Sequence, residues 1–325
     1  MIFRSIGRLV AGAIALGTFV AAASAQEYPT RPIKMVIAFP AGGPTDFVGR
    51  LLADKLKDLL GQPVIIENKA GANGAIGAEY VAKAAPDGYT LFLTTAGAVT
   101  ITPAMRTDTP YDTMRDFTPI SLVVNNTTVL VVPPNSTANS AKDLAEMAKA
   151  KPGTLPFAST GVGSMPHLAL ELYQMSAGVK FVHVPYRGAA PALTDLLGGQ
   201  VTALFADAPV LMAQIQAGKV KPLGAASDSR NPMLPNVPTL AEQGFADTKA
   251  DNWYALLGPA KMPPALIAKL NRAVRTALTD PEVNDKLVKS GAVPAPSTPE
   301  ELGKLLQSEL DRWGKIVREK GIKEG

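Results

Sequence analysis

Hydrophobic residues along the chain form two repeating patterns: short apolar runs, and segments whose apolar positions recur about every 3.6 residues. The first pattern is typical of buried strands, and the second of helices that pack one face on a core. The first part of the chain therefore predicts a strand Ile33–Ala38, a helix from about Phe47 to Leu60, a strand Val64–Ile66, a helix Ala75–Ala84 and a strand Thr90–Thr94. Strands that alternate with helices predict a mostly parallel sheet with right-handed crossovers.

A longer section, from the end of the third strand to about Ile120, has no clear period, and we expect it to be irregular. The alternation then resumes. It predicts strands near Val129–Val132, Leu155–Ala158, Phe181–Val184, Val201–Phe205 and Val220–Ala225, with helices Ser140–Ala150 and Ser164–Ser176 and two more that end near Gly198 and Gly218.

A strand at Trp253–Leu257 comes late, and three amphipathic helices close the chain, the last opening with the capping box Thr298–Glu301. Two strand-helix units and a returning strand predict an α/β protein with two lobes, which the chain connects twice, near residues 126 and 250. We expect a signal peptide at 1–25, one lobe of 26–125 plus 251–325, and a second lobe of 126–250.

The first residues have the features of an export signal: basic Arg4 and Arg8, an apolar stretch Leu9–Ala23, and the small-residue cleavage pattern Ala23-Ser24-Ala25. We expect cleavage after Ala25 and a periplasmic protein, with an uncleaved N-terminal anchor as the alternative. The net charge of +4 is too small and too scattered to favour nucleic-acid binding.

Catalytic and metal-binding patterns are scarce. The chain has no cysteine, which excludes disulfides and thiol chemistry. It has only two histidines, His167 and His183, too far apart for a metal motif, and no G-x-S-x-G sequence that would place a serine nucleophile. We therefore predict no catalytic residue, no metal and no cofactor.

Two glycine-rich loops are the strongest candidates for a binding site. The loop Pro40–Asp46 follows the first strand, and the loop Ser159–Ser164 occupies the same position in the second lobe. Each precedes a helix, whose first backbone N–H groups have no partner within the helix and favour an anion. Since ligands of open α/β sheets lie at the carboxyl ends of the strands, two such loops facing one another would suit a molecule with a carboxylate. Simple helix capping by Asp46 and Ser164 is the alternative.

A set of short motifs is spread over nearly the whole chain after the leader. They are Tyr28–Ile33, Phe39–Gly43 with Asp46, Gly61–Val64, Glu67–Asn68, Pro86–Leu91, Pro110–Asp112, Asp116–Pro119, His183–Tyr186, Asp195–Val201, Leu234–Thr239 and Trp253. Only their combination is specific, and by this combination the chain resembles the Bug (TctC-like) family of periplasmic substrate-binding proteins that serve tripartite tricarboxylate transporters.

The resemblance implies a type II periplasmic-binding-protein fold, with two lobes joined by a two-strand hinge, that closes on a small carboxylate, a dicarboxylate being the first choice. It also implies delivery to the membrane subunits of a transporter, by a monomer. The ligand-binding positions that it indicates are Phe39, Ala41, Gly42 and Asp46 in the first loop, Ser159, Thr160, Gly163 and Ser164 in the second, and Thr95, Ala96 and Asp207.

The sequence departs from the family where ligand specificity is set. Relatives often carry an acidic residue directly after the Phe205 position; here Ala206 stands there and Asp207 follows. The identity of the carboxylate is therefore open. Two other functions are also open: an exported enzyme that acts on a small carboxylic acid through Ser164, His167 or Asp207, and a receptor that presents its ligand to a sensor protein.

Overall fold

The computed structural model describes residues 28–106 and 108–322. The expected signal peptide and its cleavage site lie outside these residues. Within the described part of the chain, none of the helices is both long and apolar enough to cross a lipid bilayer.

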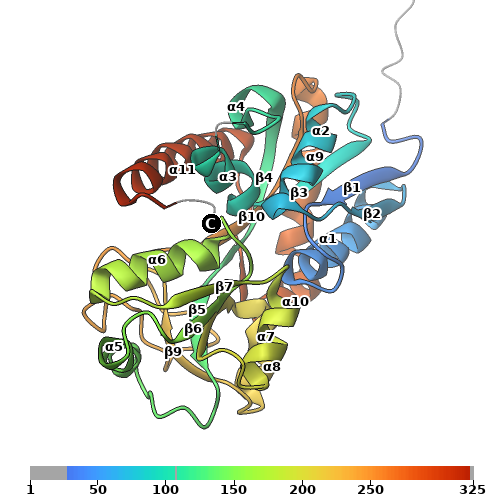
Figure 1. The fold of residues 1–325 in the computed structure, drawn as a ribbon. Helices are drawn as coiled ribbons and strands as arrows, with labels where there is room; N and C mark the ends of the chain where they lie inside the picture. The colour runs from blue at the N-terminus through green and yellow to red at the C-terminus, as the bar shows by residue number, and fades with distance from the viewer. Residues whose placement is uncertain (1–27, 107, 323–325) are drawn as a thin grey trace, which may run out of the picture.

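Two β-sheets organise the molecule (Figure 1). The first sheet has the order β11-β4-β10-β3-β1-β2, and the second has the order β7-β6-β8-β5-β9. The strands of the first sheet are β1 (Ile33–Ile37), β2 (Val64–Asn68), β3 (Thr90–Thr95), β4 (Phe117–Asn126), β10 (Asn252–Pro259) and β11 (Ala292–Pro294). Those of the second are β5 (Thr128–Val132), β6 (Pro156–Ser159), β7 (Val182–Pro185), β8 (Ala203–Asp207) and β9 (Lys221–Ala225).

Helices cover both faces of each sheet. Those associated with the first sheet are α1 (Pro44–Leu60), η1 (Ala72–Gly74), α2 (Ala75–Ala82), η2 (Gly97–Ile101), α3 (Thr102–Met105), α4 (Thr113–Asp116), α9 (Pro264–Thr279), α10 (Pro281–Ser290) and α11 (Pro299–Lys320). Those associated with the second sheet are α5 (Ala141–Ala150), α6 (Met165–Ala177), α7 (Ala189–Leu197) and α8 (Ala208–Gln216).

Side-chain alternation along the strands explains these layers. Met35 and Ile37 of β1 are buried in a core cluster with residues of α1 and α9, whereas Val36, between them, is buried in another cluster with residues of α2 and α11. Successive side chains of a strand point to opposite faces of the sheet, so a strand that is apolar throughout needs helices on both sides.

The chain passes between the sheets twice. It leaves the first sheet where β4 ends at Asn126 and enters the second where β5 begins at Thr128, and it returns between β9 and β10. Figure 1 shows the first sheet above the second, with β4 and β10 reaching down toward the connection. Both predicted crossing points therefore match changes of sheet.

Most strands of each sheet run in one direction, as expected; β10 and β11 run against the others in the first sheet, and β5 does so in the second. Two features differ from the expectation. The section expected to be irregular contains η2, whose residues are all buried, and α3, and both contact α11. The short strand β11 was not expected.

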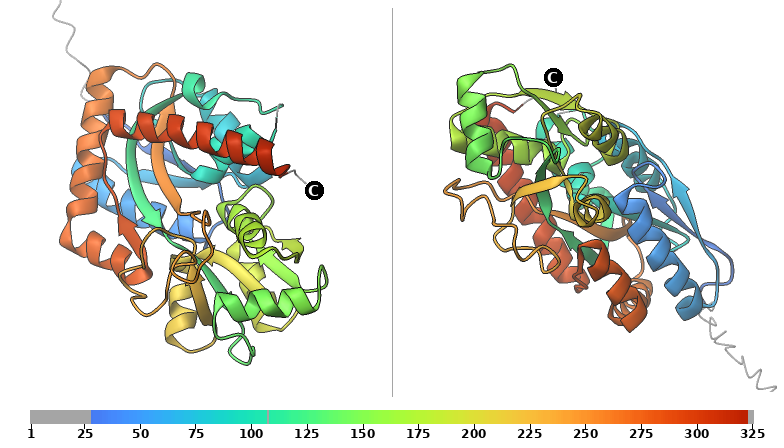
Figure 2. Two further views of the ribbon diagram at one scale, coloured as in Figure 1. Left: turned by 90° about the vertical axis from the view of Figure 1, so that its left-hand side faces the viewer. Right: turned by 90° about the horizontal axis from the view of Figure 1, so that it is seen from below.

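The last helix, α11, closes one face of the first sheet (Figure 2). It begins with the predicted capping box, in which Thr298 and Glu301 bond to one another's backbone N–H groups. Its Trp313 is fully buried and donates its indole N–H to Glu309 Oε2 at 2.8 Å.

Replacing this side chain tests how far α11 stabilises the fold. We expect Trp313→Ala to lower the free energy of unfolding by about 3–5 kcal/mol, because it leaves a large cavity in the core. Leu59→Ala is the control: this side chain is 39% exposed, and its loss should cost about 0.5 kcal/mol or less. Urea denaturation measures both, and equal losses would show that α11 contributes little through Trp313.

Candidate functional site

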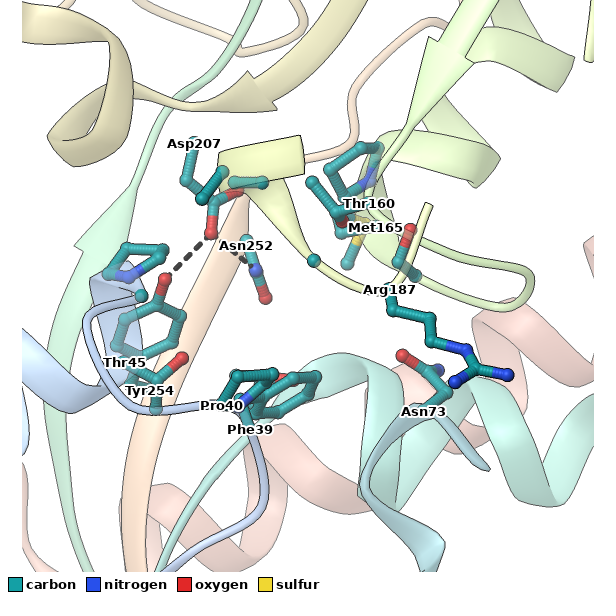
Figure 3. Close-up of a pocket in the computed structure, with 18 of the residues that line it drawn as sticks. Phe39, Pro40, Thr45, Asn73, Thr160, Met165, Arg187, Asp207, Asn252 and Tyr254 are labelled. Atoms are coloured by element: carbon teal, nitrogen blue, oxygen red, sulfur yellow. Dashed lines mark hydrogen bonds between the residues drawn. The ribbon is translucent and has the colours of Figure 1, made fainter. Parts of the chain in front are cut away.

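A cavity of about 100 Å³ lies between the two sheets. Its walls are segments that follow the carboxyl ends of β1, β3, β6, β7 and β8, where ligands of open α/β sheets are expected. The lining residues are Phe39, Pro40, Ala41, Gly43, Pro44, Thr45, Asn73, Thr95, Thr160, Ser164, Met165, Pro166, the run 187–191, Asp207, Asn252 and Tyr254 (Figure 3).

The first loop is held in shape from beneath by Asp46. Its Oδ2 accepts the N–H of Gly42 at 3.0 Å and Arg50 Nε at 2.7 Å, and its Oδ1 accepts Asn68 Nδ2 at 2.9 Å. The same amide group of Asn68 donates to the carbonyl of Phe39 at 3.0 Å. Burial raises the pKa of Asp46, but these three hydrogen bonds outweigh it and lower the pKa below its usual value. Asp46 is thus a structural anchor of the loop and does not itself line the cavity.

With Asp46 bonded in this way, the N-terminus of α1 is open to the cavity. Its N-cap is Gly43, which provides no side-chain cap, and Pro44 follows at the first helical position. Among the described residues, no acceptor bonds to the N–H groups of Ala41 and Thr45, and both residues line the cavity. The loop therefore offers backbone donors at the positive end of a helix.

The second predicted loop uses most of its own polar groups. Ser164 caps α6: its hydroxyl accepts the N–H of His167 at 3.3 Å and donates to the carbonyl of Gly161 at 2.7 Å. The N–H of Gly163 donates to His167 Nδ1 at 3.2 Å. The capping alternative therefore applies to Ser164, although this residue also lines the cavity.

Behind this loop, the two histidines form a stacked pair. Their ring centroids are 4.2 Å apart with an angle of 9° between the planes. Burial lowers the pKa of His183 to about 4; burial, with a smaller effect of His183, lowers that of His167 to about 3. His183 Nε2 lies 2.6 Å from the hydroxyl of Ser159, but Ser159 is fully buried and away from the cavity. At neutral pH the pair is uncharged and supports the loop.

A second open helix N-terminus belongs to α7, which the sequence reading did not select. Its N-cap Gly188 has a φ of 113° and provides no side-chain cap, and its N–H is bonded to the carbonyl of Thr160 at 3.2 Å. The N–H groups of Ala189 and Ala190 have no acceptor among the residues described here, and both residues line the cavity. The sequence does carry a sign of this helix start: Gly188 is followed by small residues and Pro191, a pattern typical of a glycine at a helix N-cap.

The hinge end of the cavity is polar. Asp207 ends β8, and its Oδ2 accepts Asn252 Nδ2 at 2.8 Å and the Tyr254 hydroxyl at 2.7 Å (Figure 3). Burial raises the pKa of Asp207 to about 6, while the neighbouring side chains of Tyr254, Asn252 and Thr128 act in the opposite direction. Asn252 and Tyr254 could not be selected from sequence, because only the antiparallel return of β10 brings them to this position.

Asn73 joins the two sides of the cavity. It lies in η1 with left-handed dihedral angles (φ 49°, ψ 34°). Its Nδ2 donates to the carbonyl of Gly163 at 2.6 Å and to Thr102 Oγ1 at 3.1 Å. A Cβ atom at Gly163 or at Gly97 would lie 3.2 or 2.9 Å from this nitrogen, so both glycines make room for the amide.

The structure thus divides the predicted binding residues into two groups. Phe39, Ala41, Thr95, Thr160, Ser164 and Asp207 line the cavity, whereas Gly42, Asp46, Ala96, Ser159 and Gly163 do not. Among the residues with a described position, no three His, Asp or Glu side chains are grouped as a metal site would require.

Comparison with known proteins gives a consistent result. A family model described as "Tripartite tricarboxylate transporter family receptor" (TctC) matches residues 48–322. Protein BugT of Bordetella pertussis is 39% identical over 315 residues, which cover 95% of this chain and 97% of BugT.

Solved structures with the same fold include two with ligands in their descriptions. "R. palustris Rpa4515 with adipate" superposes with a TM-score of 0.87 at 32% identity, covering 91% of this chain and 99% of that one. MatC (Rpa3494) from Rhodopseudomonas palustris "with bound malate" has a TM-score of 0.84 at 33% identity, covering 89% and 100%. The expected α/β periplasmic-binding fold is therefore confirmed.

Removing the charge of Asp46 tests its role as loop anchor. We expect Asp46→Asn to lower the free energy of unfolding at pH 7 by about 1.5–3 kcal/mol, the range for hydrogen bonds to a charged group. Because the folded-state pKa is lowered, this contribution is complete above about pH 4 and is lost as the pH falls further, so the difference between the proteins should shrink there. Asp58→Asn, on the exposed face of α1, is the control; a constant difference down to pH 2 would contradict the assignment.

The histidine pair predicts a second pH dependence. Since both pKa values lie below the ordinary one, stability is complete above about pH 6.5 and declines toward pH 4, by at most roughly 1.4 kcal/mol per pH unit for each histidine. Denaturation curves across this range give the free energy of unfolding at each pH, and this free energy should change less steeply with pH in His183→Gln than in the wild type. An unchanged pH dependence would mean that the pKa of His183 is not lowered by folding.

Proposed function

The chain belongs to the TctC family of tripartite tricarboxylate transporter receptors, and we propose that it binds one small carboxylate in the cavity between its two sheets. The observation that carries this proposal is the pair of open helix N-termini, α1 from one side and α7 from the other. Each presents N–H groups without a protein acceptor among the described residues. The bound adipate and malate of the two solved relatives support the same ligand class.

Arg187 adds positive charge to these backbone donors. It lines this cavity and a wider, adjoining one of about 750 Å³. Within the described parts of the chain, its guanidinium has no hydrogen bond or ion pair. An unpaired guanidinium that closely precedes the N-terminus of α7 favours an anion and matches the planar geometry of a carboxylate.

The site residues act in two ways in this proposal, and three of them, Thr45, Ala189 and Ala190, were not predicted from the sequence. Ala41, Thr45, Thr160, Ala189 and Ala190 hold the carboxylate, with Phe39 and Thr95 forming the apolar and polar walls beside it. The others hold the loops in place, as the bonds of Asp46 to Gly42 and of Ser159 to His183 illustrate.

We further propose that the sheets are the cores of two lobes, 26–125 plus 251–325 and 126–250, which close on the ligand about the two connections between them. The protein then acts as a periplasmic monomer, cleaved after Ala25, that delivers its ligand to the membrane subunits of a transporter. No catalytic step is needed: the Ser164 hydroxyl and His167 Nδ1 are both engaged in capping the loop that precedes α6.

Removal of one backbone donor tests the site. Ala189→Pro deletes the N–H at the first position of α7, where proline fits a helix. We expect it to weaken binding of the preferred carboxylate by roughly tenfold to hundredfold, the equivalent of one hydrogen bond to a charged group. Ala189→Gly keeps the N–H and is the matched control.

Calorimetry against dicarboxylates, hydroxy acids, aromatic acids and amino carboxylates measures these affinities, and solution scattering should show compaction with the ligand that binds. If none of these acids bound, the proposed function would be overturned. Equal affinities of the proline and glycine variants would remove α7 from the site.

A further inference from the structure

The hinge end of the cavity contains a carboxyl group without a positive partner. Asp207 is 6% exposed, lines the cavity, and receives hydrogen bonds only from the uncharged groups of Asn252 and Tyr254. No lysine, arginine or histidine of the described residues forms an ion pair with it. Its Oδ1 has no hydrogen-bond partner, and the hydroxyl of Thr128, opposite Asp207 on β5, is also unpaired.

The negative charge of Asp207 is not balanced by the described protein groups around it. A buried carboxylate is costly unless a cation or several donors balance it. The titratable groups that face Asp207 are Tyr254 from β10 and, farther away, Asp251, and neither is a cation. With a pKa of about 6, Asp207 is largely ionised at neutral pH, so the end of the cavity is negative.

The opposite side of the cavity has the reverse polarity. Figure 3 shows Arg187 beside Asn73, with Phe39 and Pro40 between them and the cluster of Asp207, Asn252 and Tyr254. The N-terminus of α7 closely follows Arg187 in the chain and adds to the positive character of the cavity. Thr45, at the N-terminus of α1, lies instead beside Tyr254, near Asp207 (Figure 3). A ligand that carries carboxylates at both ends would place one of them against Asp207, where like charges repel.

We propose that Asp207 determines ligand specificity and that the cavity takes a small amino carboxylate, with its ammonium group against Asp207 and its carboxylate toward Arg187 and the N-terminus of α7. This proposal rests on the proposed function and narrows it. The ammonium supplies the positive charge that Asp207 lacks, and the pair forms in a site shielded from water. The ligand is thereby distinguished from a plain dicarboxylate of the same length.

The test compares probes that differ only at one end. We choose β-alanine, γ-aminobutyrate and δ-aminovalerate, matched with succinate, glutarate and adipate, which replace the ammonium with a second carboxylate. Calorimetry at neutral pH should show that at least one amino carboxylate binds about tenfold or more tightly than its matched dicarboxylate. In Asp207→Asn this ratio should fall by about tenfold or more.

Asp251→Asn is the matched control. Asp251 is a half-buried carboxyl whose pKa is also raised to about 6, mainly by burial, but it lines a different cavity. Its replacement should leave the ratio unchanged. Thermal unfolding of both variants separates a change of specificity from a loss of folded protein. In the wild type, the carbon-13 shift of the Asp207 carboxyl should show that its pKa falls when the amino carboxylate binds.

The outcomes separate the two proposals. If a dicarboxylate binds the wild type as tightly as its amino partner, or if Asp207→Asn leaves the ratio unchanged, the role of Asp207 is overturned while the carboxylate receptor stands. Proton uptake on dicarboxylate binding would show that Asp207 acts as a neutral donor instead. If no probe and no member of the wider panel binds, the receptor proposal itself fails.

Discussion

The site depends on one buried carboxylate, Asp46, that does not itself line the cavity. Asp46 binds the N–H of Gly42, the guanidinium of Arg50 and the amide of Asn68, and so ties the first glycine-rich loop to α1 and β2. Without this anchor the loop would have to satisfy those donors elsewhere, and the amides of Ala41 and Thr45 would have no fixed direction. A flexible set of donors must be ordered at the moment of binding, whereas a fixed set is ready for the ligand.

Hydrogen bonds within the protein also fix the second side of the cavity. There the loop before α6 is closed on itself through Ser164 and the histidine pair, and its rigidity supports the neighbouring turn before α7. The histidines are therefore structural although they are the residues that chemistry would suggest first. A low pKa keeps both rings neutral, so that no positive charge from this pair competes with the ligand site for an anion.

Much of this architecture could be predicted from sequence, for identifiable reasons. The first loop was recognisable because Pro40, Pro44 and two glycines restrict the backbone locally. On the second side, Ser159–Ser164 has the richer pattern of glycine and serine, but capping within this loop uses some of its donors. Among the described residues, the N–H groups at the start of α7 are unbonded. The meeting of Asp207 with Tyr254 depends on the antiparallel return of β10, which no local pattern encodes. Similarly, the helical section 97–105 is stabilised by burial under α11 rather than by its own period.

The bond from Asn73 to the Gly163 carbonyl has a consequence for traffic through the membrane. It joins the two lobes directly, with no cargo atom involved. If the two sheets belong to lobes that close, as proposed above, a closed form stabilised partly by protein atoms would be populated without ligand, because a ligand only shifts an equilibrium that already exists. A transporter that receives this protein would then have to distinguish ligand-bound from ligand-free receptors by something other than closure.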